Sequence, residues 1–101
     1  MSLQVAQTIK DQLYAFDANL MGCLGSHNFR GGGEVEGKHC GFLMFDVQNL
    51  QEIQHGTVQI ILNGLDLYNI RIYGDDLDLF AVVENVYFDQ LTEVIESKIG
   101  H

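Results

Sequence analysis

The sequence contains no proline, so other residues have to form its turns. Its 11 glycines, together with asparagine and aspartate, suit that role because they adopt the positive φ angles that tight turns require. Several of the glycines gather between residues 25 and 41, where this composition favours neither a helix nor a regular strand. We therefore expect an irregular stretch there, with a flexible glycine-rich loop at about residues 31–38.

Cysteines and long apolar runs are also scarce. Cys23 and Cys40 are the two cysteines, and neither belongs to a C-x-x-C motif, which argues against a disulfide framework and favours a reducing cytoplasm. No stretch approaches the roughly 18 consecutive apolar residues of a membrane-spanning helix, and the N-terminus lacks the basic start of an export signal. We expect a cytoplasmic protein that does not bind membranes.

Basic residues are the third scarce class. Five lysines and arginines stand against 14 aspartates and glutamates, which gives a net charge of -9. This charge repels phosphate groups, so direct binding to nucleic acid or to an anionic membrane is not expected. Two explanations of the acidity remain open: the acids keep the protein soluble, or an acidic face docks on a basic groove of a partner.

What the sequence does contain predicts a single α+β domain, residues 1–101, built on an antiparallel sheet. A chain of 101 residues, 47% of them apolar, is long enough to bury one core. Residues 58–62 and 68–72 alternate between the two faces with the period of two that marks half-buried strands. Asn63 and Gly64 are expected to supply the positive φ angles of a tight turn between them.

Three further segments are expected to be strands. Residues 42–47 are apolar on both faces except for Asp46, and residues 20–24 form a short apolar run weakened by a glycine. Residues 79–83 are apolar at every position, which predicts a strand that is covered on both faces or central in the sheet. The sheet is then a meander of about four or five strands.

Amphipathic helices are predicted at both ends of the chain. The first covers about residues 3–13 and is followed by a turn at 17–19, and the second covers about 87–99 with Asn85 as its N-cap. Each carries apolar residues at helical spacing: Ala6, Ile9, Leu13 and Phe16 in the first, and Phe88, Leu91, Ile95 and Ile99 in the second. Both apolar faces are expected to pack on one face of the sheet.

No motif predicts catalysis, a cofactor or a metal. The candidate zinc ligands are Cys23, His27, His39 and Cys40, but their C-x3-H-x11-H-C spacing does not suit a zinc site. The glycine-rich run lacks the GK[ST] of a phosphate-binding loop, and the acidic residues after Gly74 lack the ligand spacing of a calcium loop. We therefore predict a protein that is not an enzyme and that needs neither cofactor nor metal.

The second half of the chain holds the candidate partner-binding residues. One group of acids is expected in the turn between two strands, and the other on the outer face of the C-terminal helix. The members are Asp75, Asp76 and Asp78 in the turn and Asp89, Glu93 and Glu96 in the helix. We predict that these six carboxylates form one or two negative surfaces that a basic groove would accept.

Three segments carry a recognisable pattern: VAQTIKDQL at residues 5–13, VQIILNGLDLYNIRI at 58–72 and VYFDQLTEVIESKIG at 86–100. In these segments the chain resembles a group of short proteins carried by bacteriophages, prophages and plasmids, whereas residues 31–56 depart from that group's pattern. The matching positions are Leu67, Tyr68, Asn69, Ile70, Val86, Tyr87, Asp89, Gln90 and Leu91. The resemblance implies an origin in a mobile element and a bacterial cytoplasm, and it brings no catalytic residues.

Two functional hypotheses follow from that resemblance and from the charge. The first is a non-enzymatic inhibitor, of the anti-CRISPR kind, that binds a host protein or ribonucleoprotein complex through its basic nucleic-acid groove. The alternative is a structural or regulatory accessory protein of the mobile element, which self-associates as a homodimer through an uncovered edge strand.

Overall fold

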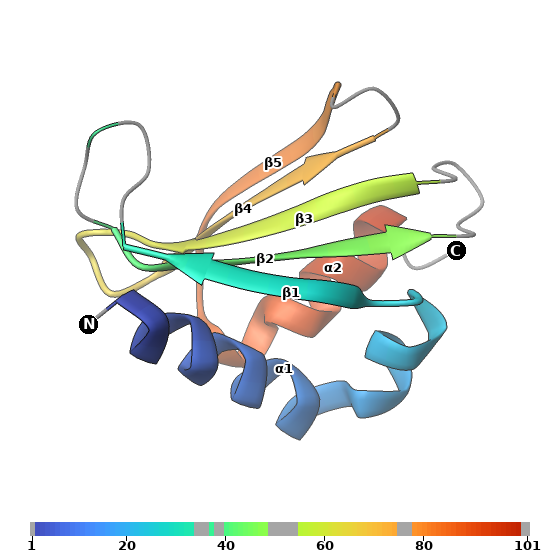
Figure 1. Cartoon of the computed structure of the whole chain (residues 1–101), viewed down its shortest axis with the longest axis horizontal. Coiled ribbons are helices and arrows are strands. Elements are labelled where there is room, and N and C mark those ends of the chain that lie inside the picture. The colour runs from blue at the N-terminus through green and yellow to red at the C-terminus, as the bar shows by residue number, and fades with distance from the viewer. Residues whose placement is uncertain (1, 34–36, 38–39, 49–54, 75–77, 100–101) are drawn as a thin grey trace.

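A computed structural model describes residues 2–33, 37, 40–48, 55–74 and 78–99 of the chain. Its elements, in chain order, are α1 (Ser2–Cys23), β1 (His27–Gly32), β2 (Phe42–Gln48), β3 (His55–Leu62), β4 (Tyr68–Tyr73), β5 (Leu79–Val86), the 3-10 helix η2 (Phe88–Gln90) and α2 (Leu91–Ile99). The five strands form one antiparallel sheet in the order β1-β2-β3-β4-β5 (Figure 1). The predicted α+β fold with a meander sheet and a helix at each end is confirmed.

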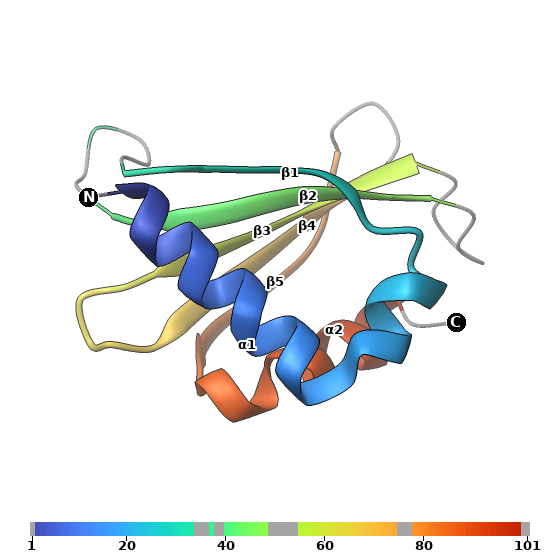
Figure 2. The same cartoon turned by 60° about the horizontal axis from the view of Figure 1, so that its bottom comes forward.

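The core lies between the two helices and one face of the sheet. Figure 2 shows α1 and α2 together on that face. Residues that pair directly across neighbouring strands point to the same side, so Phe45, Val58 and Ile72 form one buried row. From the helices, Ile9 and Ile95 are also fully buried in this cluster. No helix that the structure describes covers the opposite face of the sheet, which we call the open face.

The helix α1 is longer than predicted, and the prediction of a strand at residues 20–24 is wrong. The helix runs to Cys23 across a break at Asp17, whose φ of -159° and ψ of 79° are not helical. There the Asp17 Oδ1 accepts the N–H of Leu20 at 3.0 Å, as an N-cap does, and so starts a second helical segment. Leu20 and Leu24 lie four residues apart, and both are buried. Such a short apolar run fits a buried helical turn as well as a strand.

The strand β1 occupies residues for which we expected an irregular stretch. Gly31 and Gly32 belong to the strand and pair with Leu43 and Phe42, so the loop expected from residue 31 begins later. Residues 34–36 and 38 of that loop lie outside the described residues. A Cβ atom on Gly31 would overlap the side chain of Ala6 in α1. Glycine is required here for close packing of a helix on a strand, because a larger residue would hold α1 away.

The sequence predicted that β5 is covered on both faces or central in the sheet, but β5 forms an edge of the sheet. Ala81 and Val83 pair with residues on the core face of β4 and pack against the core. By contrast, Leu79 is 57% exposed, Phe80 40% and Val82 47%. The pattern of continuous apolar residues is the same for a strand buried on both faces and for an edge strand with an exposed apolar strip, so the sequence pattern did not separate them.

The C-terminal helix begins later than predicted. A 3-10 turn occupies residues 88–90, and α2 starts at Leu91. Leu91, Ile95 and Ile99 are buried as expected, but Phe88 is 50% exposed. Asn85 does not cap the helix: it has a φ of 58°, and its Oδ1 accepts a hydrogen bond from the Asn63 side chain at 3.1 Å.

The turn between β3 and β4 is wider than the tight turn that we predicted. The side-chain oxygen of Asn63 accepts the N–H groups of Leu65 at 2.8 Å and of Leu67 at 3.2 Å. The left-handed backbone lies at Asp66, with a φ of 61°, and not at Gly64. Asn63 therefore organises the turn with its side chain, which is a common role of asparagine.

Candidate functional site

The structure describes four of the six predicted partner-binding acids, and all four are exposed: Asp78, Asp89, Glu93 and Glu96. Asp75 and Asp76 lie outside the described residues. Asp78 precedes β5 and Asp89 follows it, so these two carboxylates lie at opposite ends of an eight-residue strand. Glu93 and Glu96 lie on α2, on the helical side of the sheet (Figure 2). Asp78 therefore lies apart from the acids that follow β5, and the one or two negative surfaces stay a prediction.

An exposed apolar strip lies along β5, between Asp78 and Asp89, and we call it the β5 strip. It consists of Leu79, Phe80 and Val82. Glu84, also exposed, lies on the same strand. The outward edge of β5 pairs with no other strand that the structure describes, so its backbone groups remain available. We did not select these residues from the sequence, because we expected them to be buried.

A pair of exposed aromatic rings lies beyond the end of β5. The rings of Phe16 in α1 and Phe88 in η2 lie 5.9 Å apart between centroids and are tilted by 59°. Tyr87, directly before η2, is exposed as well. Large apolar side chains on a surface are informative when they are contiguous, because such patches mark interaction sites. The sequence predicted that both Phe16 and Phe88 face the core, but each is 50% exposed.

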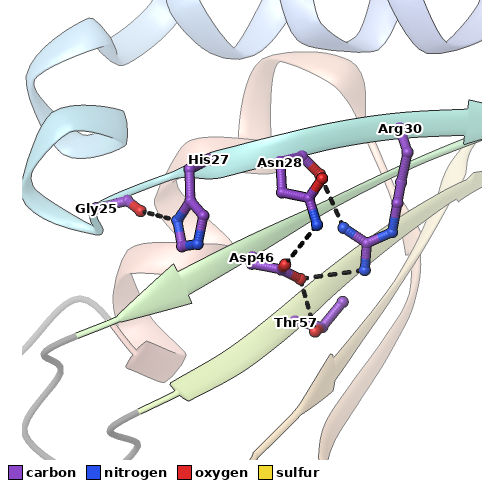
Figure 3. Close-up of polar contacts among 6 residues, drawn as sticks. All are labelled: Gly25, His27, Asn28, Arg30, Asp46 and Thr57. Carbon is purple, nitrogen blue, oxygen red and sulfur yellow. Dashed lines mark hydrogen bonds and ion pairs between the residues drawn. The ribbon is translucent and has the colours of Figure 1, made fainter.

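A polar cluster on the open face surrounds Asp46 (Figure 3). Its carboxylate accepts hydrogen bonds from Asn28 Nδ2 at 2.9 Å, from Arg30 Nη2 at 3.1 Å and from Thr57 Oγ1 at 3.0 Å. Arg30 also donates from Nη1 to the backbone oxygen of Asn28 at 2.8 Å. These four residues come from β1, β2 and β3, so the cluster holds the edge strand β1 on the sheet.

The surroundings of Asp46 suit a structural role better than an acid-base role. Partial burial by itself raises the pKa of this carboxyl group. The hydrogen bonds from Asn28, Arg30 and Thr57 and the charge of Arg30 outweigh that effect, so the pKa lies below its ordinary value of 3.8. A carboxylate that is already saturated with donors and hard to protonate is a poor general base at neutral pH.

We expect Asp46→Asn to lower the free energy of unfolding by about 1 kcal/mol at pH 7, because Asp46 is partly exposed and its charged hydrogen bonds are screened. A carboxyl group whose pKa is lower in the folded state stabilises the protein above its ordinary pKa and loses that effect as the pH falls through the folded value. Urea unfolding of parent and variant should therefore differ at pH 7, and the difference should shrink as the pH falls below 3.8.

The control is Asp66→Asn, at an exposed turn carboxylate, which should leave the stability unchanged. An Asp46→Asn difference that stays constant as the pH falls would contradict the explanation.

The candidate metal ligands are not brought together in the part of the chain that the structure describes. Within it, no group of three or more His, Cys, Asp or Glu side chains forms a possible metal site. The ring nitrogen Nδ1 of His27 lies 2.7 Å from the backbone oxygen of Gly25, and Cys23 and Cys40 are free thiols. Because His39 lies outside the described residues, the absence of zinc stays a prediction.

Comparison of the chain with models of protein families, with curated proteins and with solved structures gives no match. The resemblance to phage and plasmid proteins therefore stays a prediction that rests on the sequence pattern. Neither α1 nor α2 has the length and apolar character that a bilayer-spanning helix requires.

Proposed function

We propose that this protein is a non-enzymatic inhibitor from a phage or other mobile element, which binds a basic protein surface in a host nucleic-acid-handling complex. The observation that supports the proposal is the combination of an exposed apolar strip with a surplus of exposed acids in the same segment of the chain. Between residues 78 and 99 there are five acids, Asp78, Glu84, Asp89, Glu93 and Glu96, and one basic residue, Lys98. All five acids are exposed.

This combination matches the anatomy of a protein interface. The centre of such an interface is apolar and carries most of the binding energy, while the charged rim guides association and selects the partner. The β5 strip supplies the apolar centre, and the free backbone groups of an edge strand can pair with an extended segment of the partner. The acids nearby favour a partner that carries lysine or arginine around its docking site.

Self-association through the same edge is the second candidate function, and the free edge of β5 supports it. Its disadvantage is charge, since each copy carries a net charge of -9. The two candidates respond to salt in opposite directions. Screening weakens binding to a basic partner, whereas it reduces the repulsion between two identical acidic copies. Sedimentation analysis of the purified protein at low and high salt therefore tests the second candidate directly.

The inhibitor proposal predicts that affinity capture from a bacterial lysate at low salt recovers a nucleic-acid-handling complex. For that complex, we expect Glu93→Gln with Glu96→Gln to weaken binding by about tenfold at low salt, because two charges that face a basic rim are lost. The matched control is Asp11→Asn with Asp66→Asn, which removes the same amount of charge at exposed positions outside the 78–99 segment. Binding curves should separate the two double variants at low salt and converge as salt rises.

Two results would refute the proposal. One is equal binding by both double variants, since net charge and not the α2 surface would then matter. The other is recovery of the protein itself and nothing else, which would favour self-association.

A further inference from the structure

The open face of the sheet carries a cavity of about 230 Å³. It is lined by Arg30, Met44, Thr57, Gln59 and Tyr73, from the four strands β1 to β4. These side chains share one face because they lie opposite one another in the sheet: Met44 pairs with both Arg30 and Gln59, and Thr57 pairs with Tyr73. The strand register therefore brings the lining residues together. The cavity lies on the face opposite the helices, away from the acids of α2.

Gln59 is the unusual member of this lining. Its residue is 8% exposed, yet its amide makes no hydrogen bond with another residue that the structure describes. Polar groups buried to this degree normally have a hydrogen-bond partner. A polar group that loses its contact with water and gains no such partner costs free energy. No side-chain nitrogen or oxygen in the described residues is completely buried without a partner, so the Gln59 amide reaches the cavity. Thr57, equally buried, already donates its hydroxyl to Asp46.

We propose that this cavity binds a neutral nitrogen heterocycle, namely a nucleobase or its nucleoside. The Gln59 amide forms hydrogen bonds with the edge of the base. A glutamine amide offers a donor and an acceptor side by side, which is the pattern that adenine complements. The Tyr73 ring and the Met44 thioether give the cavity apolar walls, and a flat ring stacks favourably on tyrosine.

Size and charge restrict the ligand further. A cavity of about 150 Å³ holds benzene, so a volume of about 230 Å³ accommodates one or two fused rings. Arg30 is the cation of the lining, but its guanidinium already forms an ion pair with Asp46 at 3.1 Å. That pairing leaves the lining residues with no uncompensated charge for an anion or a cation to meet, so a neutral ligand fits best. The inference does not rest on the proposed inhibitor function, because the cavity lining contains none of the acids or β5-strip residues that support that function.

The test is a titration of the ¹⁵N-labelled full chain with adenosine, followed by amide chemical shifts. We expect saturable shifts at Met44, Thr57, Gln59 and Tyr73. Gln59→Leu, which keeps the volume but removes the amide, should weaken adenosine binding about tenfold or more. Indole, which has two rings but no adjacent donor and acceptor, should bind parent and variant alike. Gln90→Leu is the matched control at an exposed glutamine of η2 and should bind adenosine as the parent does.

Two further measurements keep the test decisive. Tyr73→Leu should weaken both adenosine and indole, and thermal melts of all variants confirm that the fold is kept. Adenosine monophosphate should bind more weakly than adenosine at low salt because of the net charge. Shifts that do not saturate, equal adenosine binding by the parent and Gln59→Leu, or tighter binding of the monophosphate than of adenosine would each overturn the proposal.

Discussion

Replacing Ile70 by aspartate is expected to unfold the whole domain. Ile70 is fully buried in β4, where it lies between Ile60 of β3 and Val83 of β5. An unpaired carboxylate at this position costs several kcal/mol, which is comparable with the roughly 5–15 kcal/mol that stabilises a small domain. Far-UV circular dichroism should show no cooperative thermal transition for Ile70→Asp, and the same result is expected for Ile60→Asp.

The control for this prediction uses the same type of substitution on the exposed side of the sheet. Val82 is an outward residue of the edge strand and lies opposite Arg71. Val82→Asp should change the free energy of unfolding by no more than about 0.5 kcal/mol, as surface substitutions usually do. Its thermal transition should therefore resemble that of the parent. A parent-like melt of Ile70→Asp would contradict the core assignment, and an unfolded Val82→Asp would mean that β5 is covered after all.

The second large effect is expected at Gly31, where α1 packs directly on β1. A side chain there would overlap Ala6, and its Cβ would lie 2.9 Å from the backbone oxygen of Phe42. The backbone of the paired strand cannot move away without breaking the sheet, so either the helix or the strand pairing has to shift. Gly31→Val should therefore lower the free energy of unfolding by about 3 kcal/mol, the upper part of the range for overpacked cores. Urea denaturation measures this directly.

Gly22 provides a control at which substitution is expected to raise, and not lower, the stability. It lies in the last turns of α1, and a Cβ atom there would meet nothing within 4 Å. Because alanine loses less backbone entropy than glycine when a helix forms, Gly22→Ala should stabilise the protein by about 0.5–1 kcal/mol. Equal losses of stability at Gly31 and Gly22 would show that glycine substitution harms this chain generally, and that the contact between α1 and β1 is not the cause.

The central strands were predictable because their pattern is local. Leu43, Phe45 and Val47 alternate with less buried residues along β2, and β4 alternates in the same way. Such a pattern fixes which face of a strand is apolar. It does not fix which strands become neighbours, so the edge position of β5 was missed. It also does not show when glycine serves close packing, and so β1 was missed.

The candidate sites also differ in how far the sequence predicted them, for the same reason. Asp89, Glu93 and Glu96 were predicted to be exposed from helical spacing alone, and they are exposed. The cluster around Asp46 and the cavity at Gln59 combine residues from three and four strands, respectively. Their assembly depends on cross-strand register, which no single segment of the sequence encodes. Within the sequence, the polar residues of otherwise apolar strands, Asp46 and Gln59, were the available signal.

The order of the strands in the sheet has a consequence for the synthesis of the protein. Because spatial order equals chain order, each hairpin can form from residues that have recently left the ribosome. The helix that emerges first, α1, packs on β1 and β2 but also on α2, which emerges last. Until α2 is released, the hydrophobic core lacks Leu91, Ile95 and Ile99. During translation we therefore expect the core of this domain to stay incomplete until the nine residues of α2 have left the ribosome.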